Sequence, residues 1–191
     1  MKYWSQIGQD KIALDLLDNK RDGYFIDIGC AAPFRLSNTA TMEEQLGWKG
    51  LGFDLKIQNP EHNEADNLGG GSVIHEGGGR SWTERPNTKT FEGDVLSLDL
   101  EKIFADEGVP EVVDFLNVDL EPWQPTFEAF KNLPHDKYKF RVIAFEHDGY
   151  RSGTEWVRMT NEYIVGLGYK LHCVVNNEEG KEQDNIYILE D

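Results

Sequence analysis

Several features that would point to other classes of protein are scarce in this sequence or missing from it. Its 191 residues include only two cysteines, Cys30 and Cys173, which are too few for a disulfide framework or a zinc cluster. With 35 acidic and 19 basic residues the formal net charge is −16, so most of the surface would repel a phosphate backbone. No apolar run approaches the roughly 18 residues of a membrane span. We therefore expect neither nucleic acid nor a membrane as a partner.

The length and composition of the chain predict a single domain. With 39% hydrophobic residues, a chain of 191 residues can bury one core but is short for two domains. The residues after Met1 are polar, unlike the basic and apolar start of a secretory signal. We expect one cytoplasmic domain over residues 1–191, and no pattern in the sequence indicates an oligomeric state.

The most informative segment is YFIDIGCAAP, residues 24–33. Its apolar residues up to Ile28 suit a strand that is covered on both faces, and Gly29 lacks the Cβ that would keep a ligand away from the backbone. In open parallel sheets, ligands bind in crevices outside the carboxyl ends of the strands. The segment therefore predicts the start of a nucleotide-like cofactor site.

The glycine pattern of dinucleotide-binding proteins is missing, because Cys30 and two alanines follow Gly29. This argues against a pyrophosphate and against a nicotinamide-dependent reductase. Asp54 ends the next apolar run, and a carboxylate there can accept hydrogen bonds from both hydroxyls of a ribose. Together the two segments suggest an adenosine-containing cofactor. The alternative is that Asp27 caps the turn and that Asp54 is simply solvated.

The rest of the chain alternates between helix and strand patterns. We expect helices over 5–17, 37–46, 98–106 and 154–167 and one more after Pro125; further strands are expected over 50–55, 112–118, 141–145, 169–175 and 185–189. The last two strands read as an antiparallel hairpin. This order predicts an α/β fold with three layers, a sheet between two layers of helices.

Residues 56–89 break the pattern. They contain two glycine triplets, at 69–71 and 77–79, together with Pro60 and Pro86. Such a long irregular segment in a compact domain is either a lid over the crevice or a disordered insertion, and both alternatives stay open. A short strand over 73–75 is expected within it.

Five segments resemble the FkbM-type family of S-adenosylmethionine-dependent O-methyltransferases, which belongs to the larger class with a seven-stranded, mostly parallel sheet. They are SQIGQD at 5–10, FIDIGCAAP at 25–33, SNT with the following GWKGLGFD at 37–54, DFLNVDLE at 114–121 and IAFEH at 143–147. They span most of the domain in the expected order. The resemblance implies a Rossmann-like methyltransferase that acts on a hydroxyl of a sugar, a glycan or another small molecule.

The resemblance also implies roles for residues around the cofactor. Asp27 and Gly29 would line its methionine part, Asp54 would hold the ribose, and Asp94 with Val95 would hold the adenine. For Asp94 the alternative is a helix cap. The expected cofactor-binding set is Gln6, Gln9, Asp27, Gly29, Cys30, Asn38, Asp54, Asp94 and Val95, with the Asn38 amide bridging the turn to the cofactor carboxylate and the two glutamines closing the pocket.

Four side chains are candidates for the chemistry, at the ends of two expected strands: Asp119, Glu121, Glu146 and His147. A hydroxyl acceptor has a high pKa, so a carboxylate or an imidazole within hydrogen-bond reach is its natural general base. The imidazole has the most suitable pKa, while Asp119 matches the position nearest the methyl group in the related fold. We expect Asp119 to position the acceptor.

Two alternatives remain for these residues. The same four side chains could hold a magnesium or manganese ion, but the sequence favours a reaction without metal that chelators leave intact, and some of the four could cap helices instead. The second alternative is a catalytically silent binding module. It arises because Pro122 and Gln124 replace a glycine and a glutamate usual in the family; Ala32 likewise replaces a polar residue.

Overall fold

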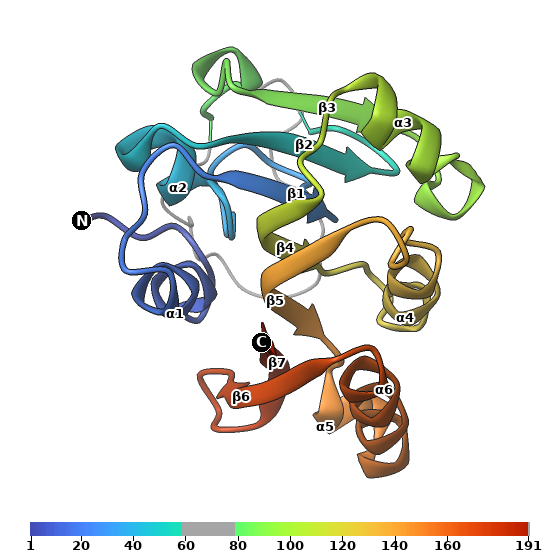
Figure 1. The fold of residues 1–191 in the computed structure, drawn as a ribbon. Coiled ribbons are helices and arrows are strands. Elements are labelled where there is room, and N and C mark those ends of the chain that lie inside the picture. Colours follow the sequence, from blue (N-terminus) through green and yellow to red (C-terminus); the bar gives the residue numbers. More distant parts are fainter. Residues whose placement is uncertain (59–78, 191) are drawn as a thin grey trace.

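The computed structural model describes residues 1–58 and 79–190, and the strand expected over 73–75 lies outside them. The described residues form one seven-stranded sheet with the order β3-β2-β1-β4-β5-β7-β6 (Figure 1). The strands are β1 Tyr24–Ile28, β2 Lys49–Asp54, β3 Thr88–Glu92, β4 Val112–Val118, β5 Lys139–Glu146, β6 Tyr169–Asn176 and β7 Glu182–Leu189. β1 to β5 pair in parallel, while β7 pairs antiparallel with both β5 and β6. The expected fold class is confirmed.

Helices cover both faces of the sheet. They are α1 Gln9–Leu16, α2 Ala40–Leu46, α3 Leu100–Asp106, α4 Gln124–Lys131, α5 Gly149–Ser152 and α6 Thr154–Gly166. Side chains of a strand alternate between the two faces, and β1 shows this clearly. Phe25 packs with α1 and α2 in one apolar cluster, while Ile26 and Ile28 pack with α3, α4 and α6 in the other. The three-layer arrangement follows from these two cores (Figure 1).

Several element boundaries differ from the sequence prediction for local reasons. α1 begins at Gln9 rather than at 5 because Gly8 has φ +92°, which no helix accommodates. α2 begins at Ala40 rather than at 37, since the Ser37 hydroxyl accepts the Ala40 N–H at 3.1 Å. β3 was not predicted at all. It is an edge strand, and its only large apolar residue is Phe91, so the sequence shows no apolar run there.

β7 begins at Glu182, three residues before the predicted start. Its early part consists of polar residues, Gln183, Asp184 and Asn185, which are nonetheless buried. They are held by pairing with β5, where Asp184 lies opposite Glu146. A polar stretch looks like a turn in the sequence, but here it completes the sheet.

The topology brings the carboxyl ends of β1, β2, β4 and β5 to one edge of the sheet. The N–H of Gly29 donates to the Phe53 carbonyl at 2.8 Å, and the N–H of Asp119 donates to the Ile28 carbonyl at 2.9 Å, so three strand ends are tied together. In the described part of the chain no helix is both long and apolar enough to cross a bilayer.

Candidate active site

A cavity of about 560 Å³ lies at this edge of the sheet. All but three of the predicted site residues line it: Gln6, Gln9, Asp27, Gly29, Cys30, Asn38, Asp54, Asp119, Glu121 and Glu146. His147, Asp94 and Val95 are the three that lie elsewhere among the described residues. Residues far apart in the sequence therefore line one cavity, and those at the ends of β1, β2, β4 and β5 do so because parallel strands bring their carboxyl ends to one edge.

Gly29 is required by the packing of the protein itself. Its φ of +92° is in the left-handed region, and a Cβ there would lie 1.6 Å from the backbone oxygen of Asp119. The sequence suggested that the missing side chain makes room for a ligand. The structure adds a second reason, because the turn after β1 passes directly over the end of β4.

Asp27 is buried below the cavity, with 2% of its surface exposed. One carboxylate oxygen accepts from the Thr39 hydroxyl at 2.6 Å and the other from the Asn117 amide at 2.9 Å. Burial raises the pKa of this carboxyl group, which the two hydrogen bonds oppose. These contacts show a buried side-chain network rather than a carboxylate that caps the turn.

Asn38 extends this network and presents one free atom. Its amide nitrogen donates to the oxygen of Asn117 at 2.8 Å. Its own oxygen is buried and has no hydrogen-bond partner among the described residues, although the residue lines the cavity. The available group is thus an acceptor, which suits an ammonium rather than the carboxylate expected from the sequence.

Asp54 is partly exposed at the end of β2 and orders two loops. One carboxylate oxygen accepts the N–H of Ala31 at 2.9 Å, and the other accepts the N–H of Lys56 at 3.0 Å. It is therefore not a merely solvated side chain. Each oxygen has a second lone pair, so the carboxylate can still accept from two hydroxyls.

Asp94 caps a helix, which is the alternative role considered for it from the sequence. Its carboxylate accepts from the Leu96 N–H at 3.0 Å and from the Ser97 hydroxyl at 3.3 Å, which caps the short helix Val95–Ser97. Val95 is buried in the core. Contact between this pair and an adenine stays a prediction.

The N-terminal segment closes one wall of the cavity. Gln9 is buried, and its amide donates to an oxygen of Asp184 at 2.6 Å, which links α1 to β7. Cys30 also lines the cavity, and the pKa of its thiol is raised by burial and by the nearby carboxylate of Asp27. This thiol is accordingly expected to be unreactive rather than nucleophilic.

Asp119 and Glu146 face each other at the other end of the cavity. Their carboxyl groups are in hydrogen-bonding contact. Burial and the negative charges of Asp27, Glu121 and Asp148 raise the pKa of Asp119 to about 6, although its hydrogen bond with Glu146 opposes this. Burial and the charge of Asp119 raise the pKa of Glu146 further. Burial likewise raises the pKa of Asp184 to about 8.

His147 does not reach this cavity. The residue is fully buried, and its ring packs against Gly149, where an added Cβ would lie 3.2 Å from the ring. Burial lowers the pKa of the imidazole, so it stays neutral. Successive side chains of a strand point to opposite faces of the sheet, so Glu146 lines the cavity and His147 does not. The candidates for a general base are therefore the carboxylates that line the cavity.

Three further polar residues were missed from the sequence. Asn117 lies in β4, two positions before Asp119. In a strand, this spacing puts both side chains on the same face of the sheet, so Asn117 could have been predicted. Asp148 follows β5 in a left-handed conformation with φ +47°. Asp184 was assigned to a polar turn, and nothing local distinguishes it from a solvated residue.

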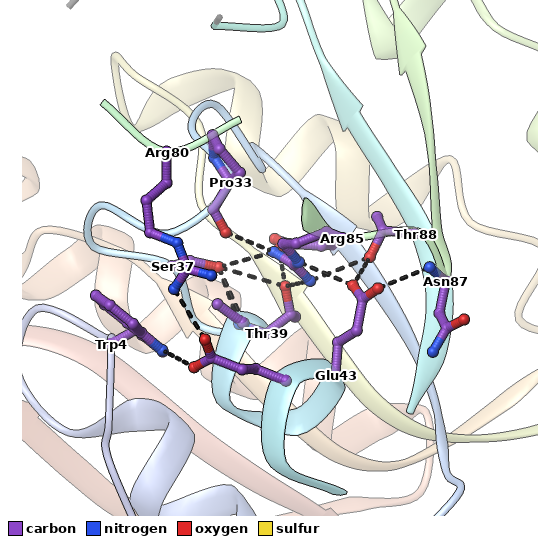
Figure 2. A network of polar contacts seen from close by, with 12 residues as sticks. Trp4, Pro33, Ser37, Thr39, Glu43, Arg80, Arg85, Asn87 and Thr88 are labelled. Atoms are coloured by element: carbon purple, nitrogen blue, oxygen red, sulfur yellow. Dashed lines mark hydrogen bonds and ion pairs between the residues drawn. The ribbon is translucent and has the colours of Figure 1, made fainter. Parts of the chain in front are cut away.

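A buried arginine holds the loops of the site together (Figure 2). Arg85 is 1% exposed and pairs with Glu43 of α2 at 2.9 Å. Its guanidinium also donates to the Pro33 carbonyl at 3.0 Å and to the Thr39 hydroxyl at 3.0 Å. Because Thr39 in turn donates to Asp27, the segment that precedes β3 is coupled to the floor of the cavity.

Comparison with solved structures identifies the fold. The Bacillus cereus O-methyltransferase in complex with S-adenosylhomocysteine is similar over 95% of this chain and 80% of its own, at 13% identity and a TM-score of 0.58. A SAM-dependent methyltransferase from Aquifex aeolicus matches over 96% and 89%, at 14% identity and 0.53. Aeropyrum pernix fibrillarin with natively bound S-adenosyl-L-methionine matches over 93% and 74%, at 14% identity and 0.54.

Neither a protein-family model nor a curated protein sequence matches the chain. The structural likenesses have low identity and concern the fold alone. With the strand order and the antiparallel hairpin, they show that this chain has the Rossmann-like fold of class I S-adenosylmethionine-dependent methyltransferases.

Proposed function

We propose that this protein is an S-adenosylmethionine-dependent O-methyltransferase, similar to the FkbM-type family, that methylates a hydroxyl of a sugar, a glycan or another small molecule. One observation supports this above the others. The expected cofactor residues Gly29, Asn38 and Asp54 line the same cavity as the carboxylates of Asp119 and Glu146. A cofactor end and an acceptor end thus share one space.

The residues present fit the proposed cofactor. The volume of about 560 Å³ is typical of small-molecule sites. The orphaned oxygen of Asn38 can accept from the ammonium of the methionine part, and Asp54 retains lone pairs for the ribose hydroxyls. When bound, S-adenosylmethionine supplies an electrophilic methyl group on a sulfonium.

The protein's own residues would then act on the acceptor. Asp119 lies at the end of β4 beside Gly29, so an acceptor hydroxyl that it binds is held next to the turn expected to contact the cofactor. Its carboxylate would take up the proton that the acceptor hydroxyl loses when the methyl group is transferred from the sulfonium, which becomes a thioether. We propose a small acceptor rather than a nucleic acid, because the net charge is −16 and three carboxylates line this end of the cavity.

Isothermal titration calorimetry of the full chain with S-adenosylmethionine tests the cofactor assignment. We expect Asp54→Ala to weaken binding at least about tenfold, since two charge-assisted hydrogen bonds of about 1.5–3 kcal/mol each are lost. Asp136→Ala is the matched control, an exposed aspartate in the turn before β5. Absence of binding to the unaltered protein would refute the proposal, and full binding by Asp54→Ala would refute the ribose contact.

The silent binding module is the competing function, and one structural detail bears on it. Gln124 is the exposed first residue of α4 and lies outside the cavity, so a carboxylate at that position would not face the acceptor. Incubation with methyl-labelled cofactor and a panel of carbohydrates separates the two functions. Transfer of label supports the enzyme, whereas tight cofactor binding with no transfer to any acceptor supports the silent module.

A further inference from the structure

Three carboxylates from separate segments converge at the acceptor end of the cavity. Glu121 follows β4, Glu146 ends β5 and Asp148 precedes α5, and one oxygen of each lies within 4.8 Å of the others. Glu121 and Glu146 line the cavity. We propose that Glu121, Glu146 and Asp148 bind a divalent cation, magnesium or manganese, beside the acceptor. Its place in catalysis rests on the proposed methyltransferase function.

Two buried oxygens point to a missing positive group. Glu146 is 5% exposed, and its Oε2 atom lies buried without a hydrogen-bond donor among the described residues. Asp184 is 2% exposed, lies directly opposite Glu146 in the pairing of β5 with β7, and has a buried Oδ1 atom that also lacks a donor. Buried carboxyl oxygens are costly without a partner. A cation next to Glu146 would provide a partner for its free oxygen.

The only ion pairs within this cluster in the described part of the chain involve Arg151. Its Nη1 atom lies 2.9 Å from Asp148 and 3.4 Å from Glu121. The arginine side chain is 51% exposed, so it can turn into solvent at little cost. It neutralises two of the three carboxylates with a single charge and forms no ion pair with Glu146. A divalent ion would replace it and contact all three.

The chemistry of the ligands fits this cation. Hard carboxylate oxygens suit magnesium and manganese, which bind them at about 2.1 Å with neighbouring ligands about 3 Å apart. The three oxygens lie within 4.8 Å of one another, and the Glu121 side chain, which is 67% exposed, can close on the ion. The remaining positions would hold water and the acceptor hydroxyl, whose pKa the ion would lower.

The ligand set differs from the one considered from the sequence. Asp148 takes the place expected for His147, because the imidazole is buried and does not line the cavity. Asp148 has a left-handed backbone, with φ +47°, and its carboxylate lies close to those of Glu121 and Glu146. The sequence alone favoured a reaction without metal, and the tertiary arrangement reverses that preference.

Binding of Mn²⁺ to the chelator-treated full chain tests the proposal without any cofactor. We expect saturable binding at one site by calorimetry or electron paramagnetic resonance. Asp148→Asn should weaken it at least about tenfold through loss of a charged ligand, and asparagine tolerates the left-handed backbone. Arg151→Gln should strengthen it several-fold by removing the competing guanidinium. Asp136→Asn, exposed and distant along the chain, should have no effect.

Two results would overturn the site: no binding of Mn²⁺ to the unaltered protein, or the same affinity for all four proteins. Circular dichroism of each variant checks that it is folded. S-adenosylmethionine binding measured in EDTA keeps the two proposals separate. Cofactor binding without any Mn²⁺ binding refutes the cation site alone, whereas Mn²⁺ binding without cofactor binding refutes the proposed function.

Discussion

Gly29 shows how a single residue serves both the fold and the site. The turn that carries it donates to Phe53 and lies against Asp119, so its geometry determines how close β1, β2 and β4 come at the edge of the cavity. The sequence located this residue through its position after an apolar strand. It could not reveal the contact with Asp119, which lies 90 positions later, directly after β4.

Substitution of this glycine is expected to be costly. In Gly29→Ala, the new Cβ meets a backbone oxygen and the left-handed conformation adds strain, so we expect a loss of about 3 kcal/mol or more in the free energy of unfolding. Urea denaturation measures it. Gly108→Ala is the matched control, because Gly108 has φ +62° and open space around it, and should lose about 1 kcal/mol. Equal losses would show that the contact with Asp119 is not limiting.

Among the elements, the segment before β3 depends most on a single side chain. Arg85 donates from all three guanidinium nitrogens, to Glu43, Pro33, Ser37, Thr39 and Thr88 (Figure 2). The sequence indicated an irregular stretch here and predicted neither this network nor β3. An arginine beside a proline in a loop pattern gives no sign that it is buried, since burial depends on α2 and the turn after β1.

Removal of this guanidinium tests its role. Arg85→Ala leaves the buried carboxylate of Glu43 without its counter-ion, so we expect a loss of about 3–5 kcal/mol in the free energy of unfolding. Arg80→Ala is the control, because Arg80 pairs with Glu44 and Glu84 at the surface and stacks on Phe34, worth about 1 kcal/mol. Chemical denaturation measures the free energy of unfolding of both variants. Similar losses would contradict the stabilising role of the Arg85 network.

At the scale of the whole molecule, the larger apolar core encloses tyrosines whose ionisation the fold opposes. Tyr24 of β1, Tyr169 of β6 and Tyr187 of β7 are buried, and burial raises the pKa of each phenol to about 12. A pKa that is higher in the folded state means that the folded protein holds the proton more tightly. The associated stability is therefore complete below about pH 10 and is lost as the pH rises from 10 to 12.

We expect alkaline unfolding to coincide with the ionisation of these tyrosines. Each pKa unit corresponds to about 1.4 kcal/mol per phenol, so three phenols can unfold a domain of ordinary stability. Absorbance of tyrosinate and circular dichroism, followed together between pH 9 and 12.5, should show the late ionisation and the loss of structure as one transition. In Tyr24→Phe its midpoint should move to higher pH. Complete ionisation of every tyrosine in a folded protein would contradict the expectation.

The sequence by itself determined the fold class, the order of every strand except β3 and many of the residues at the cavity. It could do so because apolar runs, glycine turns and the carboxylates that end strands are local patterns, and parallel strands bring their carboxyl ends to one edge. Only the tertiary structure decided which neighbours those carboxylates have. Asp184 reaches Glu146 through antiparallel pairing, His147 is buried and does not line the cavity, and Asp148 takes its place. Such relations depend on strand pairing and on the direction of each side chain, which no local pattern of residues specifies.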